Sequence, residues 1–153
     1  MIKIKKSKTA DSRTCDFAKV SKETLIASTR QHIEDVRKAM NMFCNMIIDS
    51  AIVHDKHKLE TIDDFHKAFV NGFEDDTWYK DHVKKSRHHI SNQKDVDMDT
   101  ITMVDVLEYI SDCVMAGMAR TGKVYDITLP PEVLNQAFKN TVEMLINNVK
   151  VED

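Results

Sequence analysis

The chain of 153 residues has few of the residues that tight turns and covalent cross-links require. It contains only 3 glycines and 2 prolines, whereas chains rich in β-hairpins need many more such residues for their turns. Its 3 cysteines are odd in number and show no CxxC spacing, which argues against a disulfide framework and a cysteine-based zinc site. The composition therefore favours helices joined by short loops.

Long hydrophobic runs and a strong charge of either sign are also missing. No stretch approaches the roughly 18 apolar residues of a membrane span, and no apolar stretch of signal-peptide length follows the basic residues 1–8. The net charge of -3 gives no long-range attraction to nucleic acid or to an anionic membrane. We therefore expect a cytoplasmic protein without a membrane partner and without a strong nucleic-acid signal.

The apolar spacing predicts an all-α fold, with one domain of about six helices over residues 21–153 after a polar arm at 1–20. The arm is either a short strand at Ile2 and Ile4 or a loose segment, and residues 150–153 are expected to fray. The helical pattern from Ser21 to Lys58 exceeds a typical helix, which predicts a bend near residues 41–45. Further helices are expected over 61–72, 75–88, 100–122 and 131–148.

Seven histidines are present, and several of them stand on apolar helical stripes together with aspartates. His32 lies on the stripe of the first predicted helix, and His54-Asp55 follows the apolar run 43–53. Asp112 is flanked by apolar residues, where an aspartate is costly to bury unless it is paired or bound to a cation. Imidazole and carboxylate ligands suit zinc, iron, nickel and manganese, so this pattern indicates a metal site.

The order of these residues resembles the ligand order of the HD superfamily of metal-dependent phosphohydrolases. The run His54-Asp55-Lys56-His57-Lys58 is similar to the HDxxK element of HD-GYP-type phosphodiesterases, and His88-His89 resembles their later paired histidines. The GYP motif itself is absent, so cyclic di-GMP is not supported as a substrate. Residues 21–148 also resemble a family of short phage and bacterial proteins with a W…H…HH segment, here at 78–89. If the gene is from a phage, the location would be the host cytoplasm.

The resemblance implies a single HD-type helical bundle that holds one or two divalent transition metal ions, from among iron, manganese, zinc, nickel and cobalt. In that interpretation the first ion is held by His32, His54, Asp55 and Asp112. Asp55 bridges to a second ion held by His82 and by one or both of His88 and His89. Two ions at roughly 3.5–4 Å activate a bridging water and clamp a phosphate.

Other side chains are candidates for the substrate. Lys58, together with Asp55, is expected to act in catalysis and to bind a phosphate oxygen, although a solvated lysine is the alternative. Further phosphate candidates, each more often a surface residue when taken alone, are Arg87, Arg120 and Lys123. Trp78 and Tyr79 either stack on a base or, for Trp78, pack in the core. His57 and His66 do not fit the ligand order, and we expect them to be exposed or at best behind the ligands.

Three functions are compatible with this pattern. The leading one is hydrolysis of a phosphoester in a nucleotide or cyclic nucleotide. The second is an HD-type di-iron oxygenase, which has the same ligand order. The third is a non-catalytic protein that keeps the metal for stability or for binding a nucleotide. The expected partner is a small phosphorylated ligand, and the sequence leaves an oligomer open.

Overall fold

A computed structural model describes residues 1–7, 19–124 and 126–152 of the chain. These residues are predominantly helical, which confirms the all-α class, while the HD-type bundle stays a prediction. None of the helices in the described ranges is both long and apolar enough to cross a membrane. The contacts divide the chain into two units, Met1–Asn45 with Glu143–Asp153 and Met46–Val142, which are described separately. The predicted boundary after residue 20 stays a prediction.

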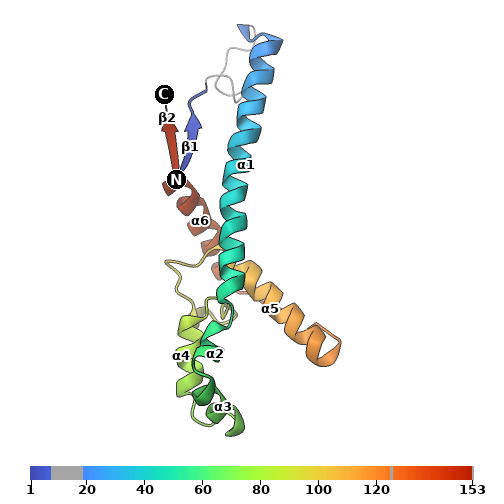
Figure 1. Ribbon diagram of the computed structural model, residues 1–153, viewed down its shortest axis with the longest axis vertical. Helices are drawn as coiled ribbons and strands as arrows, with labels where there is room; N and C mark the ends of the chain where they lie inside the picture. Colours follow the sequence, from blue (N-terminus) through green and yellow to red (C-terminus); the bar gives the residue numbers. More distant parts are fainter. Residues whose placement is uncertain (8–18, 125, 153) are drawn as a thin grey trace. The chain divides into compact units, whose positions relative to one another are not determined.

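The first unit contains two short strands that lie side by side (Figure 1). β1 (Ile2–Lys5) pairs in parallel with β2 (Val149–Glu152), with Ile2 opposite Val149. The ammonium of Lys38 in the long first helix donates a hydrogen bond of 2.9 Å to the carbonyl of Lys3. The strand at Ile2 and Ile4 is thereby confirmed, and residues 8–18 of the predicted arm lie outside the described residues. The predicted fraying of 150–153 is wrong for 150–152, because these residues pair with β1.

The first helix, α1 (Lys22–Val53), continues through residues 41–45, so the predicted bend there is wrong. This stretch holds two asparagines but no glycine or proline, and asparagine costs only about 0.7 kcal/mol relative to alanine in a helix. The hydroxyl of Ser21 accepts a hydrogen bond of 3.2 Å from the backbone amide of Thr24, as expected of an N-cap. The chain turns only at His54-Asp55, where Asp55 has φ 54, a left-handed conformation that aspartate tolerates better than most residues.

The second unit begins with the end of α1 and contains four further helices and most of a fifth. They are α2 (Lys56–Glu60), α3 (Ile62–Val70), α4 (Thr77–Lys85), α5 (Met103–Thr121) and α6 (Pro131–Asn147). The expected starts at Thr61 and Pro131 and the stop at Gly122, which has φ 68, are confirmed. α4 ends before the predicted residue 88, so the paired histidines lie in the loop that follows it.

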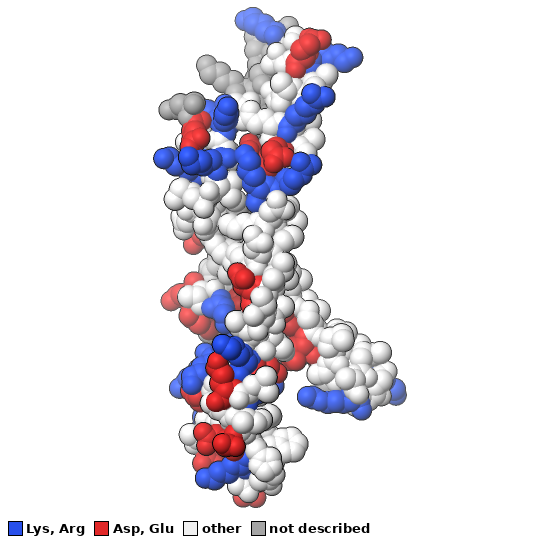
Figure 2. Space-filling model, viewed as in Figure 1, with Lys and Arg blue, Asp and Glu red and all other residues white. Residues whose placement is uncertain are grey.

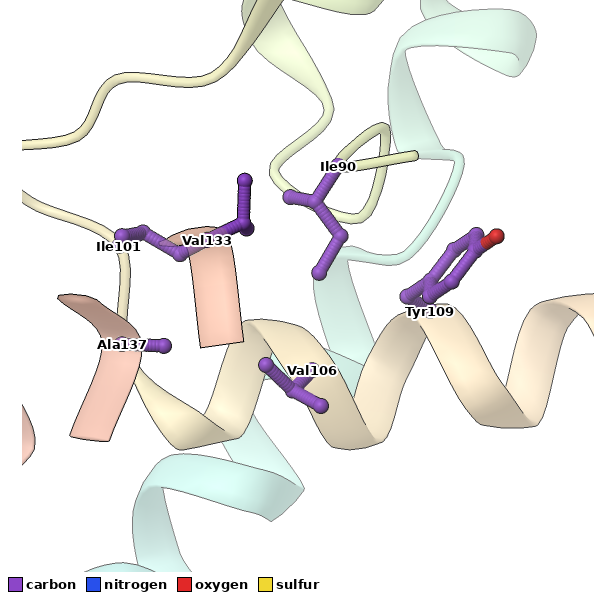
Figure 3. Close-up of a cluster of buried hydrophobic side chains, with 6 residues drawn as sticks. All are labelled: Ile90, Ile101, Val106, Tyr109, Val133 and Ala137. Atoms are coloured by element: carbon purple, nitrogen blue, oxygen red, sulfur yellow. The ribbon is translucent and has the colours of Figure 1, made fainter. Parts of the chain in front are cut away.

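The core of the second unit fixes this loop (Figure 3). Ile90 and Ile101 come from the loop segment between α4 and α5 and are buried with four residues of α5 and α6, namely Val106, Tyr109, Val133 and Ala137. The side-chain amide of Asn140 donates to the carbonyls of Met98 and Ile101 at 3.0 and 2.8 Å. The segment that carries His88 and His89 is therefore tied to the core rather than free to move.

Val133 is the best test of this core because its exposure is 0%. We expect Val133→Ala to lower the free energy of unfolding by about 2 kcal/mol, since it removes two buried methyl groups and leaves a cavity. The neighbouring Leu134, at 44% exposure, is the control, and Leu134→Ala should cost clearly less. Denaturant titration measures both values, and equal losses would contradict the core described here.

Candidate metal centre

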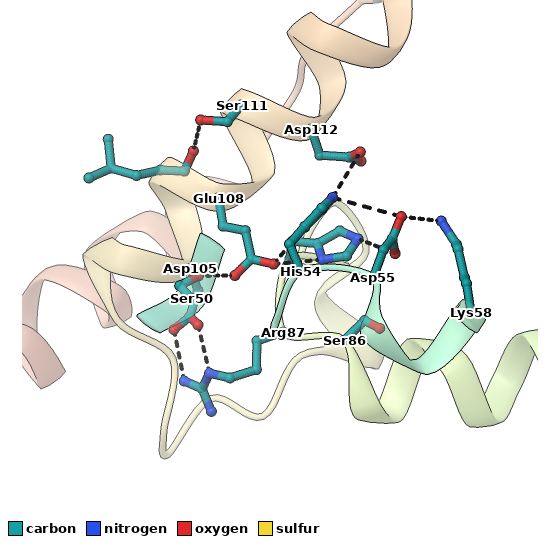
Figure 4. Close-up of polar contacts among 12 residues, drawn as sticks. Ser50, His54, Asp55, Lys58, Ser86, Arg87, Asp105, Glu108, Ser111 and Asp112 are labelled. Carbon is teal, nitrogen blue, oxygen red and sulfur yellow. Dashed lines mark hydrogen bonds and ion pairs between the residues drawn. The ribbon is translucent and has the colours of Figure 1, made fainter. Parts of the chain in front are cut away.

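The turn that ends α1 places the carboxylate of Asp55 among three imidazoles, of which Figure 4 labels that of His54. Its Oδ2 lies 3.7 Å from Nε2 of His54. Its Oδ1 lies 3.4 Å from Nε2 of His82 and 3.7 Å from Nε2 of His88. One oxygen thus faces the end of α1, and the other faces the histidines of α4 and its following loop.

Asp112 of α5 approaches the same histidine from another side, with its Oδ1 3.6 Å from Nε2 of His54. Separations of 3.6–3.7 Å are too long for hydrogen bonds. They are close to the spacing of about 3.4 Å expected between two atoms that bind one tetrahedral ion at 2.0–2.2 Å. His54, Asp55 and Asp112 therefore form one group with ligand atoms within 4.8 Å of one another.

His82, His88 and His89 form a second group that meets the same distance criterion. His82 and His88 are buried, with exposures of 1% and 2%. Burial, together with the neighbouring His89 and Lys58, lowers the pKa of His82 to about 4. Burial, His88 and Lys58 likewise lower the pKa of His89 to about 4. Both imidazoles are consequently neutral at pH 7, which is the form that binds a metal.

Unpartnered polar atoms are concentrated in this cluster. Among the described residues, four buried side-chain nitrogen or oxygen atoms lack a hydrogen-bond partner, and three of them are Asp55 Oδ1, His82 Nε2 and His89 Nε2. Each such atom costs about 1–3 kcal/mol when it is left unsatisfied. Oδ1 of Asp55 carries a lone pair, as does Nε2 of either imidazole in the tautomer with its proton on Nδ1, so the donor set fits a metal ion with nitrogen and oxygen ligands.

Glu108 of α5 orients two of these imidazoles. Its Oε1 accepts hydrogen bonds from Nδ1 of His54 at 2.9 Å and of His88 at 3.0 Å, and its Oε2 accepts the hydroxyl of Ser50. Burial raises the pKa of Glu108, but these three hydrogen bonds outweigh burial and bring it to about 2. An ionised carboxylate only accepts, so Nδ1 carries the proton on both rings and, in the neutral rings, Nε2 keeps its lone pair near Asp55.

The sequence did not assign a role to Glu108, although it lies within the helix predicted over 100–122. Its position four residues before Asp112 places both carboxylates on one face of α5, and this spacing was the available signal. The set His54, His88 and Glu108 also satisfies the distance criterion for metal ligands. The two hydrogen bonds to Glu108 account for that closeness without an ion.

His57 is buried, at 8% exposure, which agrees with the second alternative, a position behind the ligands. Its ring is stacked 5.6 Å from both Trp78 and His82, and its Nε2 lies 3.1 Å from Oδ2 of Asp81. The early end of α1 at Val53 turns α2 so that this side chain faces α4. His66 is exposed, as expected.

Trp78 packs within the second unit, in agreement with the core alternative. Its ring stacks on Phe65 at 4.5 Å and on His82 at 5.1 Å, and its indole nitrogen donates to Thr61 Oγ1 at 2.9 Å. Tyr79 is 47% exposed. The indole therefore packs against His82 and helps to hold the histidine cluster in place.

The predicted phosphate ligands are differently placed. The ammonium of Lys58 pairs with Oδ2 of Asp55 and so lies at the site. The guanidinium of Arg87 is engaged by Asp105, with Nε to Oδ1 at 2.6 Å and Nη2 to Oδ2 at 2.8 Å. Arg120 and Lys123 are exposed at the end of α5 and belong to none of the candidate ligand groups.

His32 is an exposed residue of α1 in the first unit, and none of the three ligand groups found among the described residues contains it. The structure thus brings together six of the seven predicted ligands in two groups, which are His54, Asp55 and Asp112 and then His82, His88 and His89. The assignment of His32 as a ligand stays a prediction, because His32 lies in the first unit and both groups lie in the second.

No family model matches the chain, and no curated protein or solved structure matches it either.

The hydrogen bonds of Glu108 give a test of the site that needs no metal. In metal-free protein, Glu108→Ala leaves three donors without their acceptor, on His54, His88 and Ser50, so we expect it to lower the free energy of unfolding by about 3 kcal/mol. Ser50→Ala removes only one of these bonds and should cost about 1 kcal/mol. Denaturant titration with a chelator measures both. A Glu108→Ala protein as stable as the Ser50→Ala protein would contradict this arrangement.

Proposed function

We propose that this protein is a metal-dependent phosphohydrolase that acts on a small phosphorylated ligand of the nucleotide class. The observation that carries the proposal is the occurrence of three buried, unpartnered polar atoms in one cluster, at Asp55, His82 and His89. Phosphoester hydrolysis as the reaction comes from the resemblance to the HD superfamily and from the ammonium of Lys58 beside Asp55.

The two carboxylate oxygens of Asp55 lie near different histidines, and this supports a site with two metal ions. In this proposal His54 and Asp112 hold one ion together with Oδ2 of Asp55, while His82, His88 and His89 hold another near Oδ1. The donors are imidazole nitrogens and carboxylate oxygens, which suit zinc, iron, manganese, nickel or cobalt. His32 is left out of this ligand set.

A bound divalent ion would supply a Lewis acid that makes water nucleophilic near neutral pH and offsets the charge of a phosphate. The chain's own residues prepare that chemistry. Glu108 keeps the protons of His54 and His88 on Nδ1, so neither ring needs to reorient. Lys58 holds a positive charge against Oδ2 of Asp55, from which its flexible stem can reach a phosphate oxygen.

Metal content tests the shared premise. We expect the purified protein to carry one to two equivalents of a transition metal, and Asp55→Ala to lose most of it, because Asp55 lies between both groups. Asp63→Ala is the matched control, since Asp63 is an exposed residue of α3 and should leave the metal content unchanged. Elemental analysis of anaerobically prepared protein measures both. Full metal content in Asp55→Ala would contradict the site.

Turnover tests the reaction itself. We expect the loaded protein to release phosphate from a panel of phosphoesters without oxygen, and Lys58→Ala to lower kcat about tenfold or more while keeping its metal. Lys56→Ala is the control, because Lys56 pairs with the exposed Glu60 instead. Iron with oxygen-dependent turnover would identify an oxygenase instead. Nucleotide binding without any hydrolysis would identify a non-catalytic binding protein.

A further inference from the structure

A pocket of about 280 Å³ lies between the last turns of α1 and the adjoining face of α5, within the second unit. Its walls are largely aliphatic. Ile47 and Ala51 contribute from α1, and Leu107 and Met115 contribute from α5. A small mainly apolar hollow with a few polar groups at one place is the usual form of a site for a small molecule.

The pocket is continuous with the candidate metal centre. His54 and Asp112 line it, and these two residues belong to the first ligand group, with Nε2 and Oδ1 3.6 Å apart. A molecule held between the aliphatic walls therefore lies directly against that group. The proposed function uses this end of the pocket but does not account for the apolar remainder.

The charges around the pocket restrict what enters it. No lysine or arginine is among the described residues that line it, and its charged side chains other than His54 are the carboxylates of Glu108 and Asp112. Figure 2 shows the surface along α5 as largely uncharged, with basic side chains near its end. An anionic group deep in this pocket would meet carboxylates without a compensating cation, so the pocket favours an uncharged group.

We propose that this pocket binds an uncharged, apolar part of the substrate while the phosphate lies at the metal centre. The substrate is then an ester in which an aryl, alkyl or similarly apolar group stands next to a single phosphate, rather than a polyphosphate chain. The proposal rests on the phosphoester hydrolysis proposed above, and it favours a small phosphorylated ligand with such a group over a nucleotide, whose phosphate is joined to a hydroxylated sugar.

Two phosphonates that cannot be hydrolysed at their phosphorus–carbon bond test this proposal on zinc-loaded protein. Phenylphosphonate and methylphosphonate share the same anionic head and differ in the apolar group. We expect calorimetry to give a Kd about tenfold or more lower for phenylphosphonate, because its ring leaves water for the pocket.

Pocket variants locate the effect. Ala51→Phe fills the pocket and should reduce the ratio of the two Kd values to about one to three, as should Met115→Ala, which removes part of the wall instead. Ala27→Phe is the matched control, because Ala27 is an exposed residue of the same helix outside the pocket, and it should keep the full ratio.

The outcomes distinguish a failure of the pocket proposal from a failure of the proposed function. Equal affinity for both phosphonates overturns the pocket proposal and leaves a phosphate-binding metal centre. An undiminished ratio in both Ala51→Phe and Met115→Ala also overturns it, because the apolar group would then bind elsewhere. Binding of neither phosphonate to protein shown to contain zinc overturns the proposed function, and the pocket proposal with it.

Discussion

The partly buried carboxylate of Glu108 is the contact on which the geometry of the centre depends. It joins α5 to two segments that are distant in sequence. At the end of α1 it accepts hydrogen bonds from Ser50 and His54, and in the loop after α4 it accepts one from His88. One charged acceptor thereby fixes both the position and the tautomer of two imidazoles. Loss of this group would leave the imidazoles in place only through packing.

The surrounding structure holds the centre from two sides. On one side the core residues Ile90 and Ile101 tie the loop after α4 against α5 and α6. On the other side the chain leaves α1 through Asp55 in a left-handed conformation, which costs of order 1–3 kcal/mol outside glycine. Asp55 also has a buried carboxylate oxygen without a partner. A strained backbone conformation is kept only where the surrounding structure enforces it, and such positions are typical of functional sites.

Local signals predicted three of the helix ends, but contacts between distant segments did not follow from them. Thr61, Gly122 and Pro131 mark helix ends through their own chemistry, so their positions were correct. β2 was missed because four residues carry little pattern and the strand exists only through its pairing with β1.

The candidate site shows the same difference between what local signals predict and what depends on contacts between distant segments. The HD resemblance implied that one ion is held by His32, His54, Asp55 and Asp112, and the structure brings the last three together. Glu108 was given no role because its hydrogen bonds join segments that are distant in sequence. The predicted bend at 41–45 is absent because α1 runs through this stretch, which has no glycine or proline.

The charge at the centre decides how it and the apolar pocket divide their roles. Asp55, Asp112 and Glu108 carry three formal negative charges and Lys58 carries one positive charge, so the metal-free site has a formal charge of -2 and repels a phosphate. Two divalent ions would reverse this to +2, because ions are the largest local charges in such a site. Attraction for the phosphate would then come from the metal and Lys58, and it would be similar for phosphoesters of the same charge. Discrimination among substrates is left to the uncharged wall formed by α1 and α5.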